Sequence, residues 1–165
     1  MSEVHVTGLS DLQKFLDELP AKIERNIMRG ALRAGMNQIK PVAQANVSKV
    51  SGLLAAGLKV GTRSKNGTVF ATLRTTGKHA FVARWVEFGT KPHKIEPKKA
   101  KALTLGGMRF QSVQHPGARP RPFLRPALDQ QAQAAVIAAA EYMKERLATK
   151  QGLDTSAVLI EGDEP

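Results

Sequence analysis

The sequence predicts an α+β fold. The expected body is an antiparallel β-sheet, a meander of three or more strands, packed against a long kinked N-terminal helix and a C-terminal helix. Apolar residues recur every three to four positions near both ends of the chain, which is typical of helices, and they alternate with polar residues in short runs between them. After these runs comes a stretch of 34 residues, 89–122, that is rich in Lys and Arg and has no clear period. We expect it to be a long extended basic loop or hairpin.

The predicted helices are amphipathic. A short helix is expected over residues 8–19 and a long one over 21–47, in which Pro41 introduces a kink. Gly30, Ala31, Ala34 and Gly35 make one part of the long helix narrow, which suits either packing inside the monomer or a contact between subunits. The last helix is expected over 126–148, with an alanine-rich buried stripe.

The predicted strands lie between these helices. Residues 53–62 and 68–76 are expected to form a hairpin around Asn66-Gly67, because this dipeptide readily adopts the positive φ angles of a type I′ turn. Residues 81–88 are expected to add the third strand. Gly106-Gly107 predicts a smaller hairpin inside 89–122; because a two-stranded ribbon is marginally stable alone, we expect it to be mobile in the monomer and ordered by a partner.

The length suits one domain, which we place at residues 1–148, with 89–122 projecting from it and 149–165 as a flexible acidic tail. Residues 157–160 are an apolar run in that tail and a candidate docking segment. The chain has no cysteine, which excludes disulfides and thiolate sites. It has neither an apolar run long enough for a membrane span nor a signal-peptide pattern, so we expect synthesis in the cytoplasm and no membrane contact.

Positive charge is concentrated in the middle of the chain. The formal net charge is +11; residues 21–128 carry +18, whereas residues 1–20 carry −3 and residues 129–165 carry −4. Such a body attracts phosphates or an acidic protein. The alternative is a lysine-rich face that is simply solvated.

Groups that could converge for catalysis are few. Only Glu24, Glu87 and Glu96 lie within 21–128, and His93 with Glu96 lacks a third metal ligand. Phosphate-loop and serine-nucleophile motifs are absent, and a nuclease would need clustered carboxylates. We therefore expect no enzyme activity, no metal and no cofactor. Glu87 could accept a cation from a neighbouring subunit, pair within the monomer or lie in solvent, and Trp85 could be either core or contact.

Several motifs in order resemble a known family. They are Gly8-Leu9, Ala31-Leu32-Arg33-Ala34, Pro41-Val42-Ala43, Ser51-Gly52-Leu53, Trp85-Val86-Glu87-Phe88-Gly89-Thr90 with His93, His115-Pro116-Gly117, and Arg121-Pro122-Phe123-Leu124-Arg125-Pro126-Ala127-Leu128. Together they resemble the head-tail joining and tail-completion proteins of tailed phages, a family named after gene product ten of a lambdoid phage and related to minor tail protein Z.

The resemblance implies a non-enzymatic virion protein that forms a ring, sixfold by preference and twelvefold as the alternative, at the neck or upper tail around the DNA path. It implies contacts with a connector, adaptor or stopper and with a tail terminator or tail tube. The alternative is a double-stranded nucleic-acid-binding module acting through its basic arm. We expect the subunit or partner interface to contain Trp85, Glu87, Phe88, Gly89, Thr90, His93, Leu103, Leu105, Phe110, Arg121, Phe123 and Arg125. The expected DNA-facing residues are Lys94, Lys98, Lys99, Lys101, Arg109 and Arg119.

Overall fold

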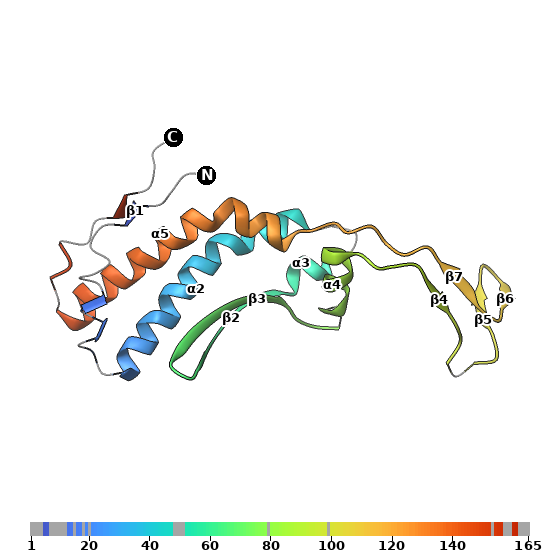
Figure 1. Ribbon diagram of the computed structural model, residues 1–165, viewed down its shortest axis with the longest axis horizontal. Coiled ribbons are helices and arrows are strands. Elements are labelled where there is room, and N and C mark those ends of the chain that lie inside the picture. Colours follow the sequence, from blue (N-terminus) through green and yellow to red (C-terminus); the bar gives the residue numbers. More distant parts are fainter. Residues whose placement is uncertain are drawn as a thin grey trace.

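The structure is a computed structural model that describes residues 5–6, 13–14, 16–17, 19, 21–47, 52–78, 80–98, 100–152, 154–156 and 160–161. Two long helices, α2 (Ala21–Asn46) and α5 (Leu124–Gln151), lie side by side. A hairpin of β2 (Leu58–Lys65) and β3 (Thr68–Thr75) packs against α2 (Figure 1). The short helices α3 (Leu53–Ala56) and α4 (Ala80–Phe88) lie at one end of the body. The fold is therefore α+β, as the sequence predicts.

The α2–α5 contact forms because α2 buries one residue in every turn. Its buried positions, Ile27, Ala31, Gly35, Ile39 and Ala43, recur every four residues and form a single stripe. A Cβ placed on Gly35 would lie 2.6 Å from the carbonyl oxygen of Ala135 on α5. Gly35 and the buried Ala31 thus lie in the core of the monomer, which fits the first of the two alternatives considered from the sequence.

The Asn66-Gly67 hairpin is confirmed. Lys65 pairs with Thr68 across a two-residue turn, and Asn66 and Gly67 have φ angles of 50° and 78°. Positive φ at both central positions defines a type I′ turn, whose twist matches that of the flanking strands. The first strand is shorter than predicted, because Leu53–Ala56 form α3 and pairing begins at Leu58.

The third strand of the predicted meander is wrong. Residues Ala80–Phe88 form helix α4, and β2 and β3 make a two-stranded sheet. Ala83 and Glu87, four residues apart, are its buried positions, so the buried side follows a helical period rather than the alternation of a strand. The N–H of Gly89 donates to the carbonyl of Trp85 at 2.8 Å and closes the last turn.

Residues 89–122, which we call the arm, extend away from the body (Figure 1). Strand β4 (His93–Ile95) pairs with β7 (Val113–His115), and β5 (Leu103–Leu105) pairs with β6 (Met108–Phe110). Gly106 and Gly107, where the sequence predicts the small hairpin, both have positive φ in the β5–β6 turn. The arm is therefore a ribbon whose ends join α4 to α5.

The remaining predictions concern the two ends of the chain. Helix α5 begins two residues before the predicted start and runs to Gln151, into the segment expected to be a tail. Beyond it, β8 (Ile160–Glu161) pairs with β1 (His5–Val6). Most of the predicted helix over 8–19 lies outside the described residues, as do positions 157–159 of the docking segment.

Candidate interaction surface

The base of the arm is fastened to α4 by backbone hydrogen bonds. Thr90 and Ala118 exchange N–H···O bonds of 2.9 and 3.1 Å across the two strands of the arm. The N–H of Arg121 donates to the carbonyl of Val86 at 2.7 Å. These contacts set the position at which the arm leaves the body.

Glu87 connects α4 to the start of α5. Its side chain is 7% exposed, and its carboxylate accepts the backbone N–H groups of Phe123 at 2.8 Å, Leu124 at 3.0 Å and Arg125 at 3.2 Å. The first N–H groups of a helix have no partner within the helix, and a negative charge there also suits the helix dipole. The carboxylate is thus used inside its own subunit to cap a helix, a role that none of the alternatives considered from the sequence included.

The same contacts determine the charge of Glu87. Burial raises the pKa of its carboxyl, but the N–H groups of Leu124, Phe123 and Arg125 and the charge of Arg125 lower it more, so that the pKa lies below its ordinary value of 4.5. The group is therefore ionised at neutral pH, and this supports its capping role.

Helix α4 presents an aromatic face to solvent. Phe81, Trp85 and Phe88 follow helical spacing and are 56%, 50% and 65% exposed. The rings of Phe81 and Trp85 meet edge to face, with centroids 5.0 Å apart. Between this helix and the arm lies a hollow of about 510 Å³, lined by Val82, Trp85, Val86, Ala118, Arg119 and Arg121. Clustered exposed aromatics of this kind mark interaction surfaces.

An apolar groove of about 760 Å³ lies on the other side of α4, between it, β3 and the start of α5. Leu73, Ala83 and Leu128 contribute apolar lining, whereas Arg84 and Arg125 contribute charge. Leu128 is 50% exposed, which shows that the groove opens to solvent.

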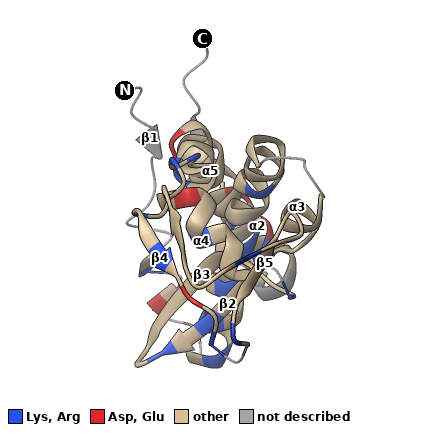
Figure 2. Cartoon of the chain, turned by 90° about the vertical axis from the view of Figure 1, so that its right-hand side faces the viewer, with Lys and Arg blue, Asp and Glu red and all other residues tan. Residues whose placement is uncertain are grey.

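The arm exposes both apolar and charged side chains. Leu105 and Met108, at the turn between β5 and β6, are 62% and 64% exposed. The described basic residues of the arm are Lys91, Lys94, Lys98, Lys101, Arg109, Arg119 and Arg121, and Glu96 is its one acid in the sequence. Lys94 and Glu96 form an ion pair of 2.7 Å that is exposed on both sides and so contributes little to stability. Figure 2 shows Lys and Arg along β2 and the arm, with few acidic positions there.

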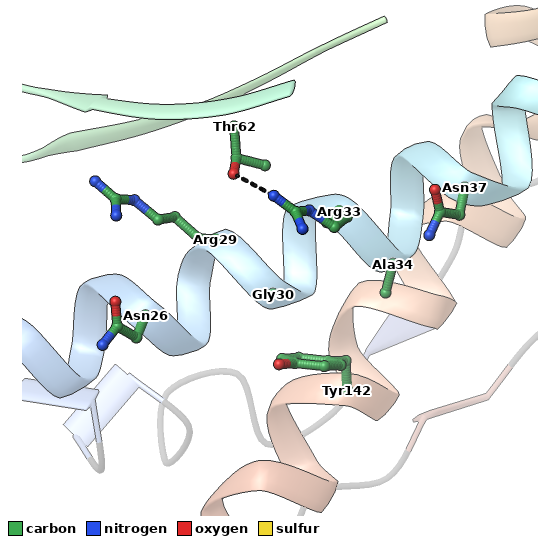
Figure 3. A pocket seen from close by; sticks show the side chains of 8 residues that line it. All are labelled: Asn26, Arg29, Gly30, Arg33, Ala34, Asn37, Thr62 and Tyr142. Carbon is green, nitrogen blue, oxygen red and sulfur yellow. Dashed lines mark hydrogen bonds between the residues drawn. The ribbon is translucent and has the colours of Figure 1, made fainter. Parts of the chain in front are cut away.

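A third, polar groove of about 630 Å³ crosses α2 beside β2 (Figure 3). The small residues Gly30 and Ala34 line this groove, and Tyr142 of α5 lies on the side of α2 that faces away from β2. Arg29 and Arg33 point toward β2, where Arg33 donates to the hydroxyl of Thr62 at 3.3 Å. The full lining is Asn26, Arg29, Gly30, Arg33, Ala34, Asn37, Thr62 and Tyr142, which contains no carboxylate.

The predicted interface residues fall into three groups in the structure. Trp85, Phe88, His93, Leu105, Arg121 and Arg125 are exposed; Gly89, Thr90, Leu103 and Phe110 are half-buried; Glu87 and Phe123 are buried. Phe123 is 0% exposed and belongs to the core cluster with Leu58 and Ala127. Among the predicted DNA-facing residues, Lys94, Lys98, Lys101, Arg109 and Arg119 are exposed, and Lys99 lies outside the described residues.

The sequence analysis missed Phe81 and Leu128 as exposed apolar residues and did not single out the polar groove. A helical interpretation of 81–88 would have placed Phe81 with Trp85 and Phe88 on one face. The groove carried no such signal, because Arg29 and Thr62 are 33 residues apart in sequence and meet only in the fold.

The described residues also bear on two other kinds of site. No three His, Cys, Asp or Glu side chains in the described ranges are placed to hold a metal ion. Within the same ranges, no helix combines the length and apolar character needed to cross a bilayer.

Comparison with known proteins bears on the first half of the chain. Residues 10–89 match the model of the HK97-gp10-like family, described as "Bacteriophage HK97-gp10, putative tail-component". Residues 10–89 resemble this family. The match confirms the predicted family resemblance, and its last residues are α4 and Gly89 at the base of the arm. The motif from Arg121 to Leu128 lies beyond it. No curated protein and no solved structure matches the chain.

Proposed function

We propose that this HK97-gp10-like protein is a structural virion component that forms a ring at the head-tail interface or the top of the tail of a bacteriophage. DNA passes through the ring, and the protein has no enzymatic activity and no cofactor. The observation that carries the proposal is the arm, which leaves the body with Leu105 and Met108 exposed at its tip.

The arm has a physical reason to bind a neighbour. Its paired strands, β4 with β7 and β5 with β6, are each three residues long, and two-stranded ribbons are marginally stable alone in water. Covering an apolar side chain contributes about 1.5–3 kcal/mol, so a neighbouring copy that buries the tip stabilises the arm. A contact between the arm of one copy and a different surface of the next is heterologous, and repeated around an axis it closes a ring.

The aromatic face of α4 is the surface offered to the neighbour. Phe81, Trp85 and Phe88 lie near the base of the arm and not at its tip, so the two halves of the contact are separated within one chain. This separation suits a head-to-tail ring. A sixfold ring is favoured and a twelvefold ring is the alternative. The ring would contact a connector, adaptor or stopper on one side and a tail terminator or tail tube on the other.

Paired substitutions at the arm tip test the proposal. Leu105→Asp with Met108→Asp places two charges on the apolar tip, and Thr104→Asp with Gln111→Asp adds the same charge at exposed polar positions of the arm. Native mass spectrometry and electron microscopy, on the protein alone and mixed with particles that lack it, measure assembly. We expect the tip variant to remain monomeric and the control variant to assemble. A wild-type protein that stays monomeric and joins no particle contradicts the proposal, as does a tip variant that assembles normally.

A second candidate function is a double-stranded nucleic-acid-binding module that grips phosphates with the arm. The exposed Lys and Arg side chains of the arm favour this candidate, because Glu96 is the only acidic residue in the arm sequence. It predicts binding that weakens steeply as salt rises, because each neutralised phosphate releases counterions. DNA binding that is absent, or insensitive to salt, removes this candidate.

A further inference from the structure

We propose that the β2–β3 hairpin, rather than the arm, binds the DNA. The solvent face of the hairpin and the free edge of β2 form a binding surface for the phosphates of a double-stranded nucleic acid. This inference deepens the proposed function, which places DNA inside the ring, by assigning the residues that meet it.

The solvent face of the hairpin is cationic. Lys59, Arg63 and Lys65 occupy alternate positions on β2, so their side chains leave the same face of the sheet. Arg74 of β3 lies directly opposite Lys59 in the register and belongs to this face as well. All four residues are exposed, whereas Leu58, on the other face of β2, is buried in the core with residues of α2.

The four cationic side chains of the hairpin repel one another, and no carboxylate nearby in sequence offsets this repulsion. Like charges directly opposite one another destabilise an antiparallel pair, and Lys59 and Arg74 are such a pair. The chain contains no Asp or Glu between Glu24 and Glu87, so neither strand of the hairpin supplies a carboxylate. A polyanion that binds this face removes the repulsion, which a neutral partner does not.

The free edge of β2 adds backbone donors. Hydrogen-bonded and non-hydrogen-bonded residue pairs alternate along an antiparallel ladder. Lys65 and Thr68, which flank the two-residue turn, form a hydrogen-bonded pair, and so do Gly57 and Thr76, since the N–H of Thr76 donates to the carbonyl of Gly57 at 2.8 Å. The odd-numbered residues of β2 therefore bond to β3, while the N–H groups of Val60 and Thr62 point to the opposite edge. In the described part of the chain no strand pairs with that edge.

Arginines also flank this edge on the α2 side. Arg33 reaches the hydroxyl of Thr62, and Arg29, one turn earlier on α2, points toward the same strands (Figure 3). Arg63 follows Thr62 in sequence and faces the opposite side of the sheet. The edge of β2 thus has cationic side chains on both sides of the sheet and backbone N–H donors between them. Strand β2 has eight residues at about 3.3 Å each, which is long enough to span several phosphates of a duplex backbone.

The residue types favour a duplex over a single strand. Proteins that bind single strands stack successive bases on several aromatic rings, whereas the hairpin has one aromatic residue, Phe70. Phe70 is 40% exposed, and the guanidinium of Arg63 lies 5.5 Å from the centroid of its ring. Cations and backbone N–H groups contact phosphates, which carry no sequence information. The surface therefore binds DNA of any sequence.

Two variants with equal charge removal distinguish the hairpin from the arm. Lys59→Gln, Arg63→Gln, Lys65→Gln and Arg74→Gln together form the hairpin variant. Lys98→Gln, Lys101→Gln, Arg109→Gln and Arg119→Gln form the arm variant. Each removes two Lys and two Arg, all exposed, and lowers the net charge from +11 to +7. Circular dichroism confirms that both fold, and fluorescence anisotropy with a mixed-sequence duplex of about 30 base pairs measures binding over a range of salt concentrations.

We expect the hairpin variant to bind DNA at least about tenfold more weakly than wild type, with a salt slope reduced by about 0.9 for each phosphate that the variant no longer neutralises. The arm variant should retain most of the affinity. Equal losses of affinity in the two variants indicate a dependence on net charge alone and overturn the assignment, and so does a larger loss in the arm variant. A wild-type protein that binds no duplex at low salt also overturns it.

A second pair tests the α2 side of the edge. Adding Arg29→Gln and Arg33→Gln to the hairpin variant should weaken its binding to the duplex further. Adding Lys22→Gln and Arg25→Gln, which lie on the same helix but outside the polar groove, should not. Equal effects of the two pairs contradict a role for the groove. Native mass spectrometry of the same proteins reports assembly independently, so that a failure of ring formation is separated from a failure of DNA binding.

Discussion

Glu87, one residue before the end of α4, accepts the backbone N–H of Phe123 at 2.8 Å, although the two residues are 36 positions apart in sequence. The whole arm lies between them. The carboxylate therefore closes the loop from which the arm projects and caps α5 at the same point. It joins the part of the chain that matches the HK97-gp10-like family to the helix that follows the arm.

Replacing Glu87 with Gln should destabilise the body. The amide keeps one acceptor oxygen but turns a donor toward N–H groups of α5, which leaves a buried donor unsatisfied at a cost of about 1–3 kcal/mol. Chemical denaturation measures the decrease in the free energy of unfolding. Glu96→Gln is the matched control, because Glu96 is exposed and forms a surface ion pair with Lys94; it should leave the transition unchanged. Equal transitions for both variants would refute the capping role.

The stability of the protein should also depend on pH through Glu87. The pKa of this carboxyl is lower in the folded protein than its ordinary value of 4.5, so the folded state binds the proton more weakly than the unfolded chain. The stabilisation is present above pH 4.5 and is lost as the pH falls through the lower, folded-state pKa. The difference in unfolding free energy between wild type and Glu87→Gln should therefore be constant near neutrality and shrink below pH 4.5. If the difference in unfolding free energy stayed constant down to about pH 2, well below the ordinary pKa of the carboxyl, the carboxylate charge would not be its cause.

The elements that the sequence predicts well are those decided by neighbouring residues. Asn66-Gly67 fixes its hairpin through the φ angles of two adjacent residues, and α2 follows from a stripe repeated over several turns. Helix α4 was not predicted. Its Phe, Val and Trp content favours a strand, and nine residues are too few for the period to decide.

What decides α4 is a partner distant in sequence. Glu87 and Ala83 share a helical face that meets the start of α5 and the core, and a strand would have placed them, with Trp85, on the side opposite Val86. The phosphate surface that we propose has the same origin. Arg33 and Thr62 come together only through the packing of β2 on α2, so no local pattern could indicate their proximity.

A substitution at Gly35 should show how closely α2 and α5 are packed. Alanine favours a helix over glycine by about 1 kcal/mol, but the added Cβ would lie 2.6 Å from the carbonyl oxygen of Ala135, a backbone atom that cannot rotate away. Overpacking of this kind costs about 1–3 kcal/mol, so we expect Gly35→Ala to be destabilising overall. Gly61→Ala is the control, since the nearest atom to its Cβ would be at an ordinary 3.7 Å. Thermal denaturation compares the two, and a more stable Gly35→Ala protein would show that the helices can separate at little cost.

Gly117 should control how firmly the arm is attached. It has a φ of 85°, and a Cβ there would collide with the carbonyl oxygen of Thr90. Gly117→Ala should therefore strain the bridge between Thr90 and Ala118, whose two N–H···O hydrogen bonds have N···O distances of 2.9 and 3.1 Å. If the strain lowers the free energy of local opening by 1–2 kcal/mol, roughly, the amide hydrogens of these two residues should exchange about 5–30 times faster, while those of α2 are unaffected. Gly106→Ala, at a φ of 56° with open space around its Cβ, is the control in the same arm. Unchanged exchange at Thr90 and Ala118 in Gly117→Ala, measured on the monomer, would mean that the bridge does not hold the arm, because strain at that point would then be absorbed without opening it.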